Sequence, residues 1–175
     1  MKMHYLIDSP VGCLTCVVSG GALIRLWAGD NAPAGTDIGV EAPLRWFDLE
    51  NQFTNYFAGR SAGFDVETQI TGTDFQQRVW SQVQRVPYGE QQTYRQIAEA
   101  LGDPYRARAV GQAIATHPIP IIFPGHRVVR SGSNPDASTE KMIVKKRLLQ
   151  LESHYTSGGS HNTAGAEWLL FSESA

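Results

Sequence analysis

The chain has 175 residues, enough for one domain or two small ones, each able to bury a core. Its formal net charge of −2 and pI near 6.2 exclude a strong overall attraction to nucleic acid, although a local basic face stays open. No apolar run reaches the ~20 residues that span a bilayer, and the N-terminus lacks a signal-peptide pattern. These properties predict a soluble, cytoplasmic protein with no membrane partner.

The N-terminal part begins with three short β-prone runs that glycine- and proline-containing turns separate. The runs cover residues 4–8, 13–19 and 23–28, which predicts an antiparallel meander. Residues 31–41 are rich in Gly, Ala, Pro and Asp and predict a loop. The apolar spacing over 42–57 predicts an amphipathic helix that stops at Gly59. This part is predicted to be a small α/β domain.

Cys13 and Cys16 are the only cysteines, and their C-x-x-C spacing raises the possibilities of half a zinc site or a redox pair. Both lie in a predicted strand, where side chains three residues apart point to opposite faces. No second cysteine pair or nearby histidine pair completes a metal site. The favoured interpretation is two small, buried or half-buried side chains and no metal.

The pattern becomes helical from Thr73 onward. Helices are predicted over 73–86, from Thr93 to Leu101, over 106–116 and over 139–153, with Gly102 ending the second. The short Gly-Asp-Pro connection between the second and third is typical of a helix-turn-helix, although ordinary core helices share the pattern. The Ser/Gly/His-rich stretch that follows predicts a flexible tail.

Five motifs between residues 65 and 152 resemble one protein family, in order and in spacing. They are Gly72-Thr73-Asp74-Phe75-Gln76-Gln77-Arg78-Val79-Trp80, Val86-Pro87-Tyr88-Gly89-Glu90, Thr93-Tyr94-Arg95-Gln96-Ile97-Ala98, Ala107-Arg108-Ala109-Val110-Gly111 and Pro124-Gly125-His126-Arg127-Val128. The family is that of the O6-alkylguanine-DNA alkyltransferases, which repair DNA by moving an alkyl group from guanine onto their own cysteine. The resemblance implies a ribonuclease-H-like α/β domain over 1–65, a mainly helical domain with a helix-turn-helix over 66–153, a tail over 154–175, and no cofactor.

Gly125 stands where the family's Pro-Cys-His-Arg-Val motif has its nucleophile. Glycine has no side chain and cannot accept an alkyl group. The resemblance therefore implies a member that does not alkylate itself at this position, with Pro124 and Gly125 in the pocket.

The resemblance also implies contact with duplex DNA through the minor groove. Arg108 matches the arginine that replaces the base swung into the protein, and Tyr94 matches the tyrosine that rotates a phosphate. A solvated surface arginine and a half-buried helix aromatic are the respective alternatives. The predicted DNA-binding surface also includes Arg95, Ala107, Gly111 and Arg127.

His126 matches the histidine that deprotonates the family's cysteine through water, with a glutamate behind it. Lys146 is predicted to occupy the position of that glutamate, and a lysine would oppose an imidazolium. In the family, the glutamate, the histidine and the cysteine form a proton relay. This relay is therefore predicted to have lost both its nucleophile and its carboxylate. A neutral histidine in a structural hydrogen bond is the alternative.

The predicted pocket departs from the family at further positions. His117 replaces the hinge asparagine, and Ser138, Thr139 and Glu140 occupy the stretch where a tyrosine lid and glycines normally line the base. A carboxylate at 140 would accept hydrogen bonds from purine N–H groups but repel O6 and N7.

Three functions remain open on the sequence. The first is a monomeric alkyltransferase-like protein that binds O6-alkylguanine lesions without alkyl transfer and flags them for an excision-repair partner. The second is a cofactor-free enzyme that hydrolyses or ring-opens a small reactive metabolite. It would use a water in the space left by the thiol, with His126 activating that water and Asp136 or Glu140 acting as acid. The third is a degenerate or altered alkyltransferase.

Overall fold

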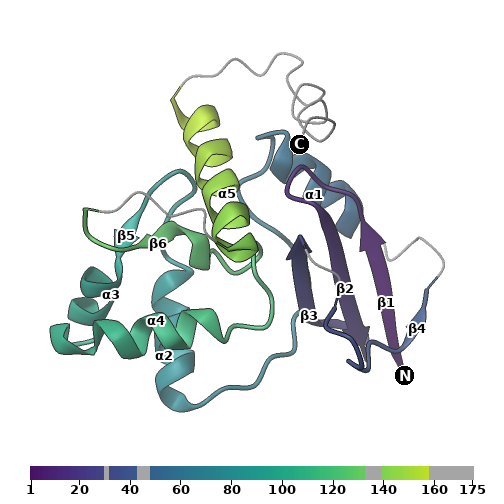
Figure 1. Cartoon of the computed structure of the whole chain (residues 1–175), viewed down its shortest axis with the longest axis horizontal. Coiled ribbons are helices and arrows are strands. Elements are labelled where there is room, and N and C mark those ends of the chain that lie inside the picture. The colour runs from purple at the N-terminus through teal and green to yellow at the C-terminus, as the bar shows by residue number, and fades with distance from the viewer. Residues whose placement is uncertain (30–31, 43–47, 133–138, 158–175) are drawn as a thin grey trace.

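The computed structural model describes residues 1–29, 32–42, 48–132 and 139–157, and the predicted tail beyond 157 lies outside them. Its N-terminal part is a four-stranded sheet in the order β3-β2-β1-β4 (Figure 1). Strands β1 (Lys2–Ile7), β2 (Cys13–Ser19) and β3 (Ala22–Gly29) form the predicted antiparallel meander. The prediction of a loop over 31–41 missed β4 (Val40–Glu41), which pairs parallel to β1 and is too short to leave an alternating pattern.

Helix α1 (Leu49–Phe57) packs on the sheet (Figure 1). Its buried side chains are Leu49, Phe53, Tyr56 and Phe57, the spacing of one helical face. These aromatic rings share one hydrophobic cluster with β1, β2 and β3. The predicted helix differs at its start: Ala42 is not helical, and α1 begins after Asp48, which has a left-handed backbone. Residues 43–47 lie outside the described part.

The second part contains α2 (Asp74–Val83), α3 (Tyr94–Ala100) and α4 (Ala107–Ala115), which pack around a separate cluster of buried side chains. Thr73 and Thr93 cap α2 and α3, each in a reciprocal capping box with a glutamine. Helices α3 and α4 are joined by a turn at Gly102 (φ +94°) and a short 3-10 helix, η1 (Pro104–Arg106). A two-stranded parallel sheet, β5 (Gln92–Thr93) with β6 (Val128–Val129), braces the start of α3.

In Figure 1, helix α5 (Glu140–Thr156) stands between the sheet with α1 and the helices α2, α3 and α4. Its residues Val144, Leu148 and Leu151 belong to the hydrophobic cluster of the sheet and α1. The N–H of Leu26 in β3 also donates to the carbonyl of Pro118, at 2.9 Å. The predicted α/β fold is therefore confirmed, and its two parts share α5 and the segment around Pro118. No helix in the described part is long and apolar enough to cross a membrane.

Candidate functional site

The site is built on η2 (Gly125–Arg127), a short 3-10 turn that follows a largely buried segment of bends and turns. Ile121 in this segment has a positive φ of 71° and is only 2% exposed, so tight packing holds a conformation that a β-branched residue rarely adopts. Pro124 precedes the turn, and its carbonyl accepts from the N–H of Arg127 at 3.0 Å. The turn aims His126 and Arg127 inward, where both are buried.

A buried carboxylate, Glu152 of α5, lies behind the turn with only 1% of its surface exposed. His126 Nε2 is 2.7 Å from its Oε1, and Arg127 donates from Nε to Oε2 at 2.9 Å and from Nη2 to Oε1 at 3.0 Å. The hydroxyl of Tyr56 donates to Oε1 at 2.6 Å, and the N–H of Gly89 donates to Oε2 at 3.0 Å. A charge taken out of water is costly unless paired, and these donors satisfy it fully.

The electrostatics of this cluster favour a charged glutamate and a neutral histidine. Burial alone would raise the pKa of Glu152, but the hydrogen bonds from His126, Arg127 and Tyr56 lower that pKa to about 2. Burial lowers the pKa of His126, although contact with Glu152 opposes the shift. A neutral His126 that donates from Nε2 has its lone pair on Nδ1, and Nδ1 is buried without a hydrogen-bond partner among the described residues. The histidine of this chain is therefore held as a potential base.

The assignment of Lys146 to the relay position was wrong. Glu152 makes that contact, so the carboxylate that was predicted to be missing behind His126 is present. Lys146 and Glu152 are six residues apart on α5, which places them on different faces of the helix. One feature of the sequence could have identified Glu152. It lies four positions after Leu148 and therefore on the apolar face of the predicted helix, where a charged residue is unusual.

The space beside Gly125 is filled rather than empty. A Cβ at residue 125 would lie 2.9 Å from Cγ2 of Ile114 and 3.1 Å from Cε1 of Phe123, both closer than normal packing allows. The prediction of a cavity the size of a side chain at this point was therefore wrong. A water activated by His126 in that space has no support.

His117 lies in the wall next to this space. Its ring stacks on Phe123 at 3.8 Å and 9°, and it meets Trp80 edge-on at 4.8 Å. Its Nδ1 accepts from the N–H of Ile119 at 3.1 Å, so the hinge position forms a side-chain-to-backbone turn. Burial lowers the pKa of His117 to about 4, which keeps the ring neutral.

The predicted DNA-binding residues of α3 and α4 fall into two groups. Arg95 and Arg108 are exposed, and Arg95 forms an ion pair with Glu99 at 2.9 Å. Tyr94 and Gly111 instead meet where α3 crosses α4, because a Cβ on Gly111 would lie 3.6 Å from the tyrosine ring. Ala107, at the start of α4, is half-buried. Gly111 therefore lies against Tyr94, and its predicted contact with DNA stays a prediction.

The expectation that Arg127 reaches DNA is not supported by its position. The residue is 6% exposed, and its guanidinium is bound to Glu152 and to the carbonyl of Val86. Leaving this pocket would strand the buried carboxylate, at a cost of several kcal/mol. Arg127 is therefore a structural partner of Glu152.

The predicted lid is only partly described. Thr139 caps α5 by accepting from the N–H of Met142, and Glu140 begins that helix. The Glu140 carboxylate lies against Gly29 at the end of β3, where an added Cβ would be 2.9 Å away. Asp136 and Ser138 lie outside the described residues, so their predicted roles stay predictions.

The two cysteines lie on β2, a strand of the sheet. Burial raises the pKa of Cys16 to about 12, and burial also raises the pKa of Cys13. Both shifts lower the thiolate fraction on which nucleophilic attack depends. The described part of the chain contains no group of three His, Cys, Asp or Glu side chains that could hold a metal ion.

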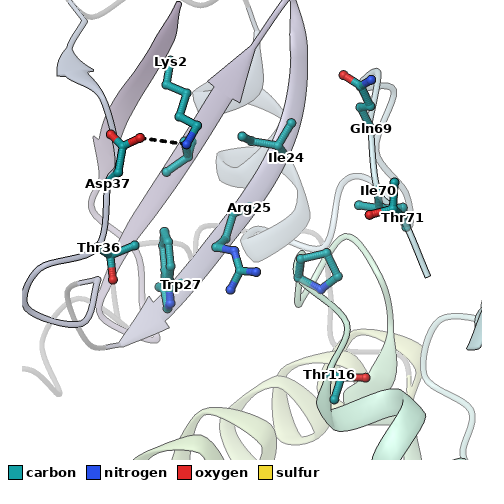
Figure 2. A pocket seen from close by; sticks show the side chains of 12 residues that line it. Lys2, Ile24, Arg25, Trp27, Thr36, Asp37, Gln69, Ile70, Thr71 and Thr116 are labelled. Atoms are coloured by element: carbon teal, nitrogen blue, oxygen red, sulfur yellow. Dashed lines mark hydrogen bonds and ion pairs between the residues drawn. The ribbon is translucent and has the colours of Figure 1, made fainter. Parts of the chain in front are cut away.

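A cavity of about 330 Å³ opens elsewhere, between the sheet and residues 69–71, which follow α1. Figure 2 shows Arg25 and Trp27 of β3 on one side and Gln69 and Thr71 on the other. Its lining includes neither His126 nor any of the groups bound to Glu152. The cavity therefore offers no binding site for a metabolite next to the histidine.

Comparisons with known proteins agree with this geometry. The sequence model "6-O-methylguanine DNA methyltransferase, DNA binding domain" matches residues 74–154. A methylated-DNA–protein-cysteine methyltransferase of Mycobacterium tuberculosis is 40% identical over 153 residues, 86% of this chain and 92% of that protein. The same enzyme of Methanosarcina acetivorans is 35% identical, over 86% of this chain and 98% of its own.

Solved structures give the same result for the fold. A crystal structure of the M. tuberculosis O6-methylguanine methyltransferase aligns with a TM-score of 0.80 and 38% identity, over 89% of this chain and 94% of that one. The M. tuberculosis protein in complex with DNA aligns with a TM-score of 0.78 and 37% identity, over 87% and 94% of the two chains. At this identity and coverage, the chain belongs to the O6-alkylguanine-DNA alkyltransferase family.

Proposed function

We propose that this protein binds O6-alkylguanine lesions in duplex DNA and does not transfer the alkyl group to itself. The observation that carries the proposal is Gly125 at the start of η2, in front of an intact His126–Glu152 pair. The base of the relay is in place, but there is no thiol beside it to deprotonate. Binding is then the step that the scaffold retains.

The proposed DNA contact is the exposed face of α4, with α3 and α4 acting as a helix-turn-helix. Arg108, Gln112 and Ala115 are exposed and follow the helical repeat, so this face presents a long cation, an amide and a small apolar side chain. Such a surface suits a minor groove, where a long arginine can fill the gap that a flipped base leaves. Relatives named as methyltransferases of methylated DNA, and one solved in complex with DNA, support this assignment.

The remaining expectations belong to the same proposal. A monomer in the cytoplasm that marks lesions would need an excision-repair partner, because binding alone leaves the alkyl group on the base. The division into domains at residues 65 and 153 also stays a prediction, since α5 packs on the sheet as well as on η2.

The test is a binding titration followed by a mass measurement. Labelled duplexes with and without a single O6-methylguanine are titrated with the protein, and the intact mass is then recorded. We expect tighter binding of the lesion duplex and no gain of 14 Da, the mass of one transferred methyl group.

Arg108→Ala should reduce the affinity for both duplexes about tenfold or more, because the arginine contributes phosphate attraction and base replacement. The matched control is Arg60→Ala, which removes an exposed arginine after α1, far along the chain from α4. Equal binding of both duplexes contradicts the proposal. So does a methylated peptide that contains Cys13 or Cys16.

A further inference from the structure

The cavity of about 330 Å³ beside β3 lies apart from the groups that surround Glu152. Pockets that hold small organic molecules begin at about 300 Å³, so this cavity has room for more than an inorganic ion. Its lining combines apolar and polar side chains. The apolar ones include Val17, Ile24, Ile70 and Pro118, and the polar ones include Thr36, Gln69, Thr71 and Thr116. A ligand that fits this lining has an apolar part and a polar part.

An irregularity in β3 brings Arg25 and Trp27 to this cavity together. Leu23 and Arg25 pair with consecutive residues of β2, so Ile24 is an extra residue, a β-bulge. In a regular strand Arg25 would lie on the same face as Leu23, which is completely buried in the core. With the bulge, Arg25 lines the cavity next to Trp27 instead. The bulge therefore places a cation and an aromatic ring on one side of the cavity.

Arg25 is the cation of this cavity that has no counter-charge among the described residues. Its guanidinium lies over the indole of Trp27, 5.4 Å from the ring centroid (Figure 2). The other cation in the lining, Lys2, is paired with Asp37 at 2.8 Å. The described lining therefore keeps one net positive charge, which favours an anionic ligand.

We propose that this cavity binds a nucleotide, with the phosphate on Arg25 and the base against Trp27 and the apolar lining. An arginine presents a planar fork of N–H donors that matches the oxygens of a phosphate. Bases stack on aromatic side chains whatever their identity, because every base has a flat π-face. Gln69 and Thr71, across the cavity in Figure 2, offer hydrogen-bonding groups to the sugar or the phosphate. A free nucleotide and a nucleotide within a single DNA strand share this chemistry, and the experiment separates them.

The first test is a calorimetric titration of the protein with deoxyguanosine monophosphate, deoxyguanosine and inorganic phosphate. The monophosphate should bind more tightly than either fragment, because only the monophosphate carries both the ring and the charge. Arg25→Gln should weaken binding of the monophosphate about tenfold or more, as expected for a lost hydrogen bond to a charged group, and should leave deoxyguanosine binding unchanged. Trp27→Leu should weaken binding of both the monophosphate and deoxyguanosine.

Three variants control for charge and for stability. Arg60→Gln removes another exposed arginine, which follows α1, and should leave binding of the monophosphate unchanged. Arg25→Lys keeps the charge without the planar fork and should retain part of the affinity that Arg25→Gln loses. Because Arg25 is exposed, neither of its variants should lower the urea midpoint of unfolding. Asp37→Asn frees Lys2 from its counter-charge and should tighten binding of the monophosphate, whereas weaker binding would contradict an anionic ligand.

A single-stranded oligonucleotide separates the two sources of the nucleotide. A loss of oligonucleotide affinity in Arg25→Gln, with the monophosphate as a competitor, assigns the cavity to a nucleotide within a strand. An unchanged oligonucleotide affinity, with a loss for the monophosphate alone, assigns it to a free nucleotide. Binding of the monophosphate and the oligonucleotide that is absent or independent of Arg25 overturns the proposal. So does inorganic phosphate that binds as tightly as the monophosphate. Lesion recognition is measured separately, as the ratio of the two duplex affinities, and Arg25→Gln should leave that ratio unchanged.

Discussion

Glu152 shows how much one buried charge can depend on its neighbours. Its carboxylate is 1% exposed and accepts from four residues, of which Arg127 carries a full positive charge. Glu152→Gln leaves that guanidinium buried without a counter-charge, so we expect a loss of about 3–5 kcal/mol in the free energy of unfolding. Urea denaturation measures the loss.

The control for this change is Glu99→Gln. Glu99 also pairs with an arginine at 2.9 Å, but both side chains are largely exposed. Exposed ion pairs contribute about 0–1 kcal/mol. The loss in the free energy of unfolding should therefore be several-fold smaller for Glu99→Gln than for Glu152→Gln. Similar losses at both positions would contradict the burial of the Glu152 charge.

The buried His126 and the half-buried His117 predict a stability that falls in acid. Burial lowers the pKa of both His126 and His117 in the folded chain, the latter to about 4, whereas unfolded histidines titrate near 6.5. Below pH 6.5 the unfolded chain therefore binds more protons, and stability is lost as the pH falls. Glu152, with its pKa lowered from 4.5 to about 2, adds a second loss below pH 4.5.

Urea midpoints between pH 8 and pH 3 measure this dependence. His117→Gln should make the urea midpoint depend less steeply on pH between pH 6.5 and pH 4. The slope of that dependence below pH 4 should not change. A midpoint that stays constant from pH 8 to pH 4 would show that neither histidine is held neutral.

The residue scale is also where the sequence misled. His126 and Gly125 could be predicted because their motif is contiguous. Glu152 is not part of that motif. It lies 26 residues after His126, beyond a stretch that departs from the family pattern, so the motif does not reveal its role. Only its position on the apolar face of α5, after Leu148, identifies it as buried.

At the scale of the elements, short helices depend on their first residues. Helix α3 has seven residues, and its start is held by Thr93, which accepts from the N–H of Gln96 at 3.1 Å. Thr93→Ala should cost about 1 kcal/mol of stability. It should also weaken DNA binding, because fraying of α3 disturbs the packing of Tyr94 against α4.

Thr73→Ala is the matched control for this helix start. Thr73 caps α2 in the same way, with its hydroxyl accepting from Gln76 at 3.3 Å. We expect a similar loss of stability and unchanged DNA affinity, measured by urea denaturation and duplex titration. A Thr93→Ala variant that binds as tightly as the wild type would contradict a role of α3 in presenting α4.

The elements were largely predictable because their signals are local. Short β-prone runs between glycine- and proline-containing turns marked the meander, and Thr93 and Gly102 marked both ends of α3. The sequence did not indicate β4, whose two residues are held by pairing with β1 rather than by their own pattern. Pairing between distant segments leaves no periodicity within a short segment.

At the scale of the whole molecule, Tyr56 connects the sheet-bearing part to the site. It lies on α1, and its hydroxyl donates to Glu152 at 2.6 Å and lies 3.5 Å from Nε2 of His126. Tyr56→Phe removes a buried hydrogen bond to a charged group and should cost about 1.5–3 kcal/mol. Urea denaturation measures the cost.

Tyr105→Phe serves as the control for the loss of a hydroxyl. Tyr105 is 95% exposed on η1, so the free energy of unfolding of the Tyr105→Phe variant should equal that of the wild type. A Tyr56→Phe variant as stable as the wild type would mean that the hydrogen bond to Glu152 contributes nothing to holding the two parts together.

The donors around Glu152 come from positions 25, 26, 63 and 96 residues away along the chain. Contacts of such long range close large loops, and the chain must lose the entropy of those loops before it gains the contacts. The carboxylate cluster should therefore form late in folding, after the local helices and the meander. Its substitutions should mainly speed unfolding and leave the folding rate nearly constant, so the part of the molecule that holds the base also sets how long the native state persists.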